Sequence, residues 1–342
     1  MRTTLRIGLI GAGANTRARH LPGFRAMPGV EVTTVVNRSA ESSARVAMEF
    51  GIPGIAADWR EVVADPNIDA VCIGTWPYLH AEITVAALAA GKHVLTEARM
   101  ARNFPEARAM LKAAEARPDL VAQVVPSPFT LPFDAAVSGI LARGELCEVR
   151  EVTVTHTTAI YANPAAPMTW RQDETLSGHN TLMLGIYYEA VRRWMGEDAT
   201  VVSADAAVFT PRRAWPTGRM VDVRIPESLT VLGRYANGAR LVMHHSGVES
   251  GAPRNEIRVS GTHGSLRLDV GARALWRAAT PGAVEERVAV DTAAGDGWRV
   301  EADFIDSIRT GAPVRLTDFA TGACTMRFTD EVWQAWAGKP GA

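Results

Sequence analysis

The sequence predicts an α/β protein with two domains. Residues 1–125 are expected to form a doubly wound parallel sheet, and residues 126–342 an α+β domain with a large, mostly antiparallel, open-faced sheet. At 342 residues, the chain is longer than one hydrophobic core usually organises. Apolar runs alternate with helical patterns up to Pro126, and strand-like runs joined by turns follow it. These observations together predict the fold class.

The first domain is predicted from the order of its elements. Strands rich in Val and Ile are expected at 5–11, 30–36, 68–75, 92–97 and 120–126. Helical patterns lie between them at 18–27, 40–51, 80–91 and 105–116. This alternation is typical of βαβ units, in which helices cover both faces of a parallel sheet.

The second domain is predicted from strands that follow one another. Strand-like runs lie at 149–158, 228–248, 255–270 and 274–279, and the turn Asn237-Gly238 divides the second run into a hairpin. Apolar residues on one side predict a helix over 178–196. We expect a closing helix over 317–337 to pack back on the first domain.

Composition excludes several classes of partner. The 36 Lys and Arg against 37 acidic residues leave no basic excess for nucleic acid or an anionic membrane surface. No apolar run approaches the ~18 residues that a membrane span requires. Cys72, Cys147 and Cys324 are far apart and lack zinc spacing, so we expect a reduced, cytoplasmic chain without a metal site.

A glycine turn follows the first predicted strand and indicates a dinucleotide site. Gly11 can make the tight turn, and Gly13 lets the backbone approach a pyrophosphate at the start of the next helix. Ala14 and Asn15 follow, and Thr16 stands where a third glycine is usual. The alternative is a turn that only joins a strand to a helix.

The end of the second predicted strand favours NADP over NAD. An NAD site places Asp or Glu there on the ribose hydroxyls, but this chain has Asn37, Arg38 and Ser39. A guanidinium and a hydroxyl can bind a 2′-phosphate. The alternative is that Arg38 is a solvated surface charge.

Several stretches resemble the glucose-fructose oxidoreductase and inositol dehydrogenase family (Gfo/Idh/MocA). They are "GLIGAG" near the start, "AVCIGTWPYLHAEITVAALAAGKHVLTE" at 70–97, "TWRQDETLSG" at 169–178, "LGIYYEAVRRWMG" at 184–196 and "VSGTHGSLRLD" at 259–269. The resemblance implies a Rossmann domain, an open-faced sheet domain and NAD(P)-dependent oxidoreduction of sugars, cyclitols or related polyols. It also implies a homodimer or homotetramer, which we expect to form through the open sheet.

The resemblance also implies roles for residues of the first domain. Thr75, His80 and Glu97 match positions that line the nicotinamide side of the cleft, and we assign Trp76 to the same group. Gly11 and Gly13 match the pyrophosphate turn.

The departures from the family concern proton transfer. The family reads Glu-Lys-Pro where this chain has Glu97-Ala98-Arg99, and its catalytic Asp and His are replaced by Met183 and Tyr187. Moving a hydride to or from an alcohol or ketone requires a proton acceptor or donor, which is worth roughly 10²–10⁴ in rate. Ala98 and Met183 cannot supply one.

Helical spacing suggests replacements for the missing groups. His179, Met183 and Tyr187 are expected on one helix face, which the resemblance directs into the cleft. Tyr187 is the first candidate for the catalytic acid or base, and His179 is the second. The alternatives are an aromatic core residue for Tyr187 and a helix cap for His179.

Other polar residues are candidates for substrate binding. Arg99 could hold an anionic substrate, or be a surface arginine, or pair with Glu97 or Glu106. The remaining candidates are His156 on a predicted strand, Tyr161, Trp170 and Arg171 in the following loop, and Asn180. His244 and His245 are adjacent on a strand, point to opposite faces and cannot form a metal pair.

Three classes of function remain open. The first is an oxidoreductase, with NADP favoured, that acts on a small cyclic polyol, sugar derivative, ketone, diol or imine. The second is a glycoside hydrolase or lyase in which the cofactor is oxidised and reduced without net change. The third is a binding protein that keeps the cofactor fold without turnover.

Overall fold

The computed structural model describes residues 4–290 and 297–338. The chain divides into two compact units, one made of residues 1–126 and 299–326, the other of 127–298 and 327–342. Residues 299–326 thus join the first unit, although the sequence-based boundary puts them in the second domain. They do so because Phe319, Ala323 and Met326 contribute to the core of the first unit. The outer limits of the predicted domains, residues 1–3 and 339–342, lie outside the described residues.

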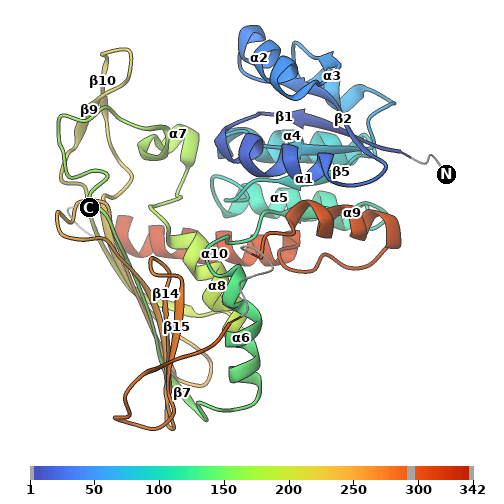
Figure 1. The fold of residues 1–342 in the computed structure, drawn as a ribbon. Helices are drawn as coiled ribbons and strands as arrows, with labels where there is room; N and C mark the ends of the chain where they lie inside the picture. The colour runs from blue at the N-terminus through green and yellow to red at the C-terminus, as the bar shows by residue number, and fades with distance from the viewer. Residues whose placement is uncertain (1–3, 291–296, 339–342) are drawn as a thin grey trace. The chain divides into compact units, whose positions relative to one another are not determined.

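The first unit contains a six-stranded parallel sheet in the order β3-β2-β1-β4-β5-β6 (Figure 1). Its strands are β1 (Leu5–Ile10), β2 (Val30–Val36), β3 (Gly54–Ile55), β4 (Ala70–Ile73), β5 (His93–Thr96) and β6 (Ala122–Val124). All four residues of β4 are buried, as expected for a central strand covered on both faces. The predicted doubly wound sheet is confirmed.

Helices α1 (Leu21–Arg25), α2 (Ala40–Phe50), α3 (Trp59–Ala64), α4 (His80–Ala89) and α5 (Phe104–Glu115) connect these strands. The first unit also contains α9 (Val300–Thr310) and residues 319–326 of α10 (Phe319–Ala337), which come after the strands of the second unit in the sequence. A π-helical turn, η1 (Thr16–His20), precedes α1, and a 3₁₀ turn, η2 (Pro77–Leu79), precedes α4. Ser39, Asp58 and Asn103 cap α2, α3 and α5, because each side chain accepts a hydrogen bond from a first-turn backbone N–H.

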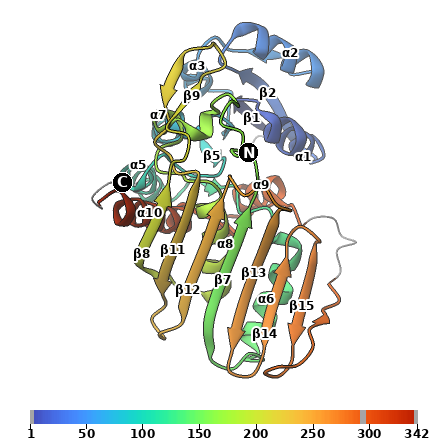
Figure 2. The ribbon, with the colours of Figure 1, turned by 90° about the vertical axis from the view of Figure 1, so that its left-hand side faces the viewer.

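The second unit contains an eight-stranded sheet in the order β16-β15-β14-β13-β7-β12-β11-β8 (Figure 2). Its strands are β7 (Val149–Thr157), β8 (Thr200–Ala207), β11 (Ser228–Arg234), β12 (Arg240–Ser246), β13 (Arg254–Gly261), β14 (Ser265–Asp269), β15 (Ala274–Ala278) and β16 (Glu286–Arg287). Every pair is antiparallel except β12 with β7. The predicted hairpin at Asn237-Gly238 joins β11 to β12, and Gly238 has a φ of 86°.

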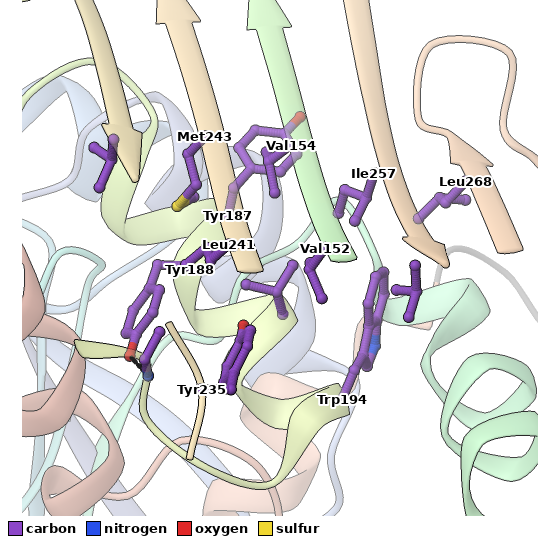
Figure 3. Close-up of a cluster of buried hydrophobic side chains, with 14 of the residues drawn as sticks. Val152, Val154, Tyr187, Tyr188, Trp194, Tyr235, Leu241, Met243, Ile257 and Leu268 are labelled. Atoms are coloured by element: carbon purple, nitrogen blue, oxygen red, sulfur yellow. Dashed lines mark hydrogen bonds between the residues drawn. The ribbon is translucent and has the colours of Figure 1, made fainter. Parts of the chain in front are cut away.

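Helices α6 (Leu131–Ala142) and α8 (Leu184–Met195) cover one face of this sheet (Figures 1 and 2). Alternate residues of the strands, such as Val154, Met243 and Ile257, point to that face and pack with Tyr187 and Trp194 of α8 (Figure 3). A short hairpin, β9 (Arg212–Ala214) with β10 (Met220–Asp222), and α7 (Glu174–Ser177) complete the unit.

The helix predicted over 178–196 begins later than expected, at Leu184. Gly178 and Leu182 have φ angles of 66° and 46°, in the left-handed region that a helix cannot contain. His179, Met183 and Tyr187 therefore do not share a helix face, and that prediction is wrong.

Across the described stretches, no helix combines the length and apolar character needed to cross a membrane.

Candidate functional site

Two glycine-containing turns meet at the carboxyl ends of β1 and β4, where the strand order of the first sheet reverses. Gly11 has a φ of 87°, and a Cβ on it would lie 2.7 Å from the backbone of Gly74. A Cβ on Gly74 would lie 2.2 Å from the Gly11 carbonyl oxygen and from Thr16 Oγ1. The two glycines are thus in backbone contact at the switch point, where ligands of such sheets bind.

Gly13 differs from these two glycines because the space beside it is open. A Cβ there would meet only the Gly74 carbonyl oxygen, at 3.7 Å. Thr16, at the place of the third glycine, is buried, and its hydroxyl donates to the Gly11 carbonyl at 3.3 Å. Ala14 and Asn15 are exposed at the helical start. The turn therefore carries no side chain at Gly11 or Gly13, and the Thr16 hydroxyl hydrogen-bonds to its backbone.

The turns open into a cavity of about 490 Å³. Its lining includes, from the predicted cofactor residues, Gly11, Gly13, Asn37, Arg38, Ser39, Thr75 and Trp76. Gly13 leaves room for a pyrophosphate, and within the described part of the chain Thr75 Oγ1 is buried without a hydrogen-bond partner. An open glycine and an unpartnered hydroxyl beside one cavity fit a dinucleotide.

The end of the cavity beside β2 carries positive charge. Arg38 and Arg45 are exposed there, and among residues 4–290 and 297–338 neither forms an ion pair. The Arg38 guanidinium lies 5.4 Å from the ring centroid of Trp76. Asn37 accepts a hydrogen bond from the Ala12 N–H at 2.6 Å, so the residue at the usual carboxylate position braces the glycine turn.

A buried chain of charged groups lies at the end of β5. Glu97 Oε1 accepts from Asn15 Nδ2 at 2.5 Å and faces His20 Nε2 at 3.0 Å. The other ring nitrogen of His20 faces Glu301 Oε1 at 2.5 Å. Burial opposes the charged ring, but hydrogen bonds with Glu301 and Glu97 outweigh it and raise the pKa of His20 to about 9. Burial alone would raise the pKa of Glu97, yet His20 and Asn15 lower it.

His80 braces loops instead of lining the cavity. Its side chain is buried, Nδ1 faces the carbonyl oxygen of Arg99 at 3.1 Å, and Nε2 faces that of Thr75 at 3.0 Å. Burial lowers its pKa. The ring therefore couples the loop after β4 to the loop after β5.

Arg99 is 8% exposed, so the alternative of an outward-facing surface arginine is wrong. Glu106, one of the two partners considered for it, binds Arg102 Nε at 2.8 Å. The Ala98–Arg99 peptide bond is cis.

In the second unit, four polar residues gather at one end of the helix-covered face of the sheet. His156, His245 and Asn255 are paired in register on the neighbouring strands β7, β12 and β13. The Tyr187 hydroxyl, from α8, donates to Asn255 Oδ1. The ring centroids of His156, Tyr187 and His245 are 5.4 to 6.0 Å apart. We call these four residues the polar cluster.

Burial separates the members of the polar cluster. Tyr187 and His245 are fully buried, whereas His156 is half-buried. Burial, helped by His156 and His244, lowers the pKa of His245 to about 3, and burial also lowers that of His156. Burial raises the pKa of Tyr187. Both imidazoles are therefore neutral near pH 7, and the cluster reaches the surface through His156 and Asn255.

His179 and Asn180 lie in the turn before α8. The predicted cap role of His179 is wrong, because Met183 occupies the N-cap and makes no side-chain cap bond. Instead, His179 Nδ1 contacts Asp330 Oδ1 at 2.8 Å and its ring stacks on Trp333 at 4.6 Å. Asn180 is buried and donates to the Ser177 carbonyl at 2.6 Å.

The loop after β7 is held from inside the second unit. Tyr161 is buried, and its ring fills the space beside Gly247, where a Cβ would lie 2.4 Å from it. Arg213 is also buried, donates to the Tyr161 carbonyl at 2.7 Å and pairs with Glu227 at 2.8 Å. The structure thus gives Tyr161 a packing role beside Gly247.

Farther along this loop, Trp170 and Arg171 form a cation–π pair with a distance of 4.4 Å from the guanidinium to the ring centroid. On β12, His244 hydrogen-bonds with Thr230 at 2.9 Å, while His245 points to the helix-covered face. The predicted opposite orientation of the two histidines is confirmed.

Several residues of these sites were not among the sequence-based candidates. They are His20, Arg45, Asn255 and Glu301. His20 closely follows the glycine turn, and Arg45 lies on the helical segment that begins after Ser39, so their positions in the sequence could have suggested both. Glu301 and Asn255 are far from their partners in sequence and carry no local signal.

Comparison with known proteins identifies the family of the chain. Residues 5–124 match the model of an oxidoreductase family with an NAD-binding Rossmann fold, and residues 135–267 match the Gfo/Idh/MocA C-terminal domain. The fold and the cavity define the class as NAD-binding oxidoreductases. The chain belongs to the Gfo/Idh/MocA family.

Individual relatives are similar over most of the chain. Levoglucosan dehydrogenase from Pseudarthrobacter phenanthrenivorans is 27% identical over 287 residues, which are 77% of this chain and 73% of that protein. Trans-1,2-dihydrobenzene-1,2-diol dehydrogenase from Sus scrofa is 27% identical over 261 residues, 76% of this chain and 71% of that protein. A solved structure of levoglucosan dehydrogenase in complex with NADH has a TM-score of 0.87 at 25% identity and covers 98% of this chain and 97% of that one.

Proposed function

We propose that this protein is an NADP-favouring oxidoreductase that transfers a hydride to or from a small cyclic polyol or its ketone. The observation that carries the proposal is the turn at Gly11 and Gly13, which opens onto a cavity. Arg38 and Arg45 line this cavity, and neither forms an ion pair with another described residue. The bound cofactor would accept or release the hydride. Side chains of the protein must supply proton transfer and substrate binding.

The preference for NADP rests on charge at the β2 end of the cavity. Arg38 and Arg45 can both reach a 2′-phosphate, and Ser39 lies at the N-terminus of α2, where an anion is favoured. Asp58 also lines the cavity, but Arg60 lies 3.2 Å from its carboxylate and offsets its charge. NADH in the levoglucosan dehydrogenase complex makes NAD the competing cofactor.

Proton transfer is assigned to the polar cluster. A neutral His156 can take the hydroxyl proton of an alcohol, and the same nitrogen can return it to a ketone. Tyr187 is the second candidate, since its hydroxyl already donates to Asn255 and can exchange a proton with a neighbour. Its complete burial beneath Phe129, whose ring stacks on it at 5.8 Å, favours His156 for direct contact with substrate.

Substrate binding is assigned to groups that can hold hydroxyls or an anion. Ring hydroxyls suit the amide of Asn255 and the imidazole of His156. The names of the relatives, a levoglucosan and a dihydrodiol dehydrogenase, support a small cyclic polyol. Arg99 stays a candidate for an anionic substituent.

The experiment for the cofactor is a titration with NADP⁺ and NAD⁺ by isothermal calorimetry. We expect wild type to bind NADP⁺ more tightly, and Arg38→Ala to weaken NADP⁺ by about tenfold or more, the range of one charge-assisted hydrogen bond. NAD⁺ binding should change less than about twofold. Arg108→Ala, at an exposed position on α5, is the matched control. An equal loss for both cofactors in Arg38→Ala would refute the phosphate assignment.

We also propose a homodimer or homotetramer through the uncovered face of the eight-stranded sheet. Leu232 is 38% exposed on that face, and Val242 lies beside it in register on β12. Light scattering of wild type and Leu232→Lys tests this, because a charge at the interface should dissociate the assembly. A monomeric wild type, or an assembly unaffected by the charge, would argue against this surface.

A further inference from the structure

The mechanism above does not use the buried charges beside the glycine turn, the chain Glu97–His20–Glu301. The side chains of His20, Glu97 and Glu301 are 0%, 15% and 4% exposed. The three groups come from three elements, because His20 ends η1, Glu97 follows β5 and Glu301 lies in the first turn of α9. Such a cluster is costly to bury and therefore calls for a role.

Hydrogen bonding fixes the charge of the cluster. An ionised carboxylate only accepts, so a ring with a carboxylate oxygen on each nitrogen must donate from both and be an imidazolium. Two carboxylates and one imidazolium leave one net negative charge. When His20 loses its proton, the net charge doubles.

The cluster lies on the side of the sheet where the nicotinamide belongs. With the pyrophosphate at Gly11 and Gly13, the dinucleotide continues across the carboxyl ends of the strands beyond the switch point. Glu97 is the first residue after β5, and Asn15 of the glycine turn donates directly to it. A charge held at this point acts on the nicotinamide ring, which is positive when oxidised and neutral when reduced.

We infer that the Glu97–His20–Glu301 chain tunes the cofactor, stabilising its oxidised form relative to its reduced form to an extent set by the protonation of His20. The inference rests on the proposed cofactor site. His20 and Glu301 are positioning residues in this role, because they act through Glu97 and through charge.

Other titratable groups near the cluster are few among the residues the structure describes. Cys72 on β4 is buried, and burial together with both carboxylates raises its pKa. His80 on α4 interacts with Glu97, and burial lowers its pKa. Neither group changes charge in the pH range in which His20 titrates, since the pKa of His20 is about 9.

The test is the ratio of dissociation constants for NADP⁺ and NADPH, measured by calorimetry as a function of pH. The 2′-phosphate titrates in both cofactors and cancels in the ratio. We expect the ratio to fall by about tenfold as pH rises through the pKa of His20, because one added negative charge favours the oxidised ring. In Glu301→Gln, the acceptor that faces His20 Nδ1 loses its negative charge, which lowers the pKa of His20, so the fall should move to lower pH. Glu115→Gln, exposed at the end of α5, should keep the wild-type profile.

A second variant keeps the test decisive if Glu301→Gln fails to fold. A Cβ on Gly23 would lie 2.6 Å from Glu301 Oε2, so Gly23→Ala displaces the carboxylate without removing its charge and should shift the profile in the same direction. A wild-type ratio that does not change with pH overturns the inference, as does a profile that is identical in wild type and both variants. Absence of binding for both cofactors would instead overturn the proposed function.

Discussion

Gly13→Ala separates the cofactor role of the glycine turn from its structural role. The added Cβ meets only the Gly74 carbonyl oxygen at 3.7 Å, an ordinary van der Waals distance. The fold should therefore tolerate it, and replacing glycine at such a position changes the free energy of unfolding by no more than about 1 kcal/mol. The same Cβ occupies the space that a pyrophosphate needs. We expect NADP⁺ affinity to fall by about 10- to 100-fold, from the loss of one or two charge-assisted hydrogen bonds.

Gly74→Ala is predicted to lower the stability of the fold, unlike Gly13→Ala. Its Cβ would lie 2.2 Å from both the Gly11 carbonyl oxygen and Thr16 Oγ1, so the two turns must move apart by most of an ångström. Overpacking of this kind costs about 1–3 kcal/mol, and it also displaces the turn that binds the cofactor. Both the stability and the affinity should fall.

Chemical denaturation and calorimetric titration of the two variants measure these outcomes. Gly251→Ala is the control, because a Cβ there has no neighbour within 4 Å. Wild-type affinity in Gly13→Ala would refute the assignment of the pyrophosphate to this turn. A loss of stability in Gly13→Ala equal to that in Gly74→Ala would show that the two glycines have the same structural role.

Three further predictions concern buried charge and proton transfer. Arg213→Met should lower the free energy of unfolding by about 3–5 kcal/mol in denaturant titrations, because Glu227 keeps an uncompensated buried charge; an unchanged midpoint would contradict this. The pKa of His20 is raised from 6.5 to about 9 on folding, so its stabilisation is complete below about pH 6.5 and lost through about pH 9. That loss, up to about 3 kcal/mol, should be absent in His20→Gln. His156→Gln should lower kcat by about 10²–10⁴, whereas His179→Gln should lower stability with little effect on kcat; the reverse pattern would exchange their roles.

The fold could be predicted from sequence because its signals are local. Val- and Ile-rich runs of strand length, glycine turns and alternating apolar residues each lie within one element, and the order of the elements identifies the parallel and antiparallel sheets. The start of α8 could not be predicted, because the apolar pattern extends back through Leu182, whose left-handed φ prevents the helix from beginning before it. The return of residues 299–326 to the first unit likewise depends on tertiary packing of Phe319 and Met326.

The candidate site was predictable where it is contiguous in sequence. Gly11, Gly13 and Arg38 line one cavity as expected. Proton transfer was harder to assign, because the polar cluster depends on the register of three strands that pair His156 with Asn255 across about 100 residues of chain. The Glu97–His20–Glu301 chain was not predicted, because Glu301 is far from Glu97 and His20 in the sequence.

The most direct test of the central claim, net hydride transfer, is a stoichiometric assay with NADP⁺ and a panel of small cyclic polyols. The absorbance of the reduced nicotinamide and the amount of ketone product are measured together. We predict one reduced cofactor for each ketone formed, with the rate lost in His156→Gln. A substrate that is consumed while the cofactor returns unchanged would contradict net oxidoreduction and point to a cofactor-assisted hydrolase or lyase.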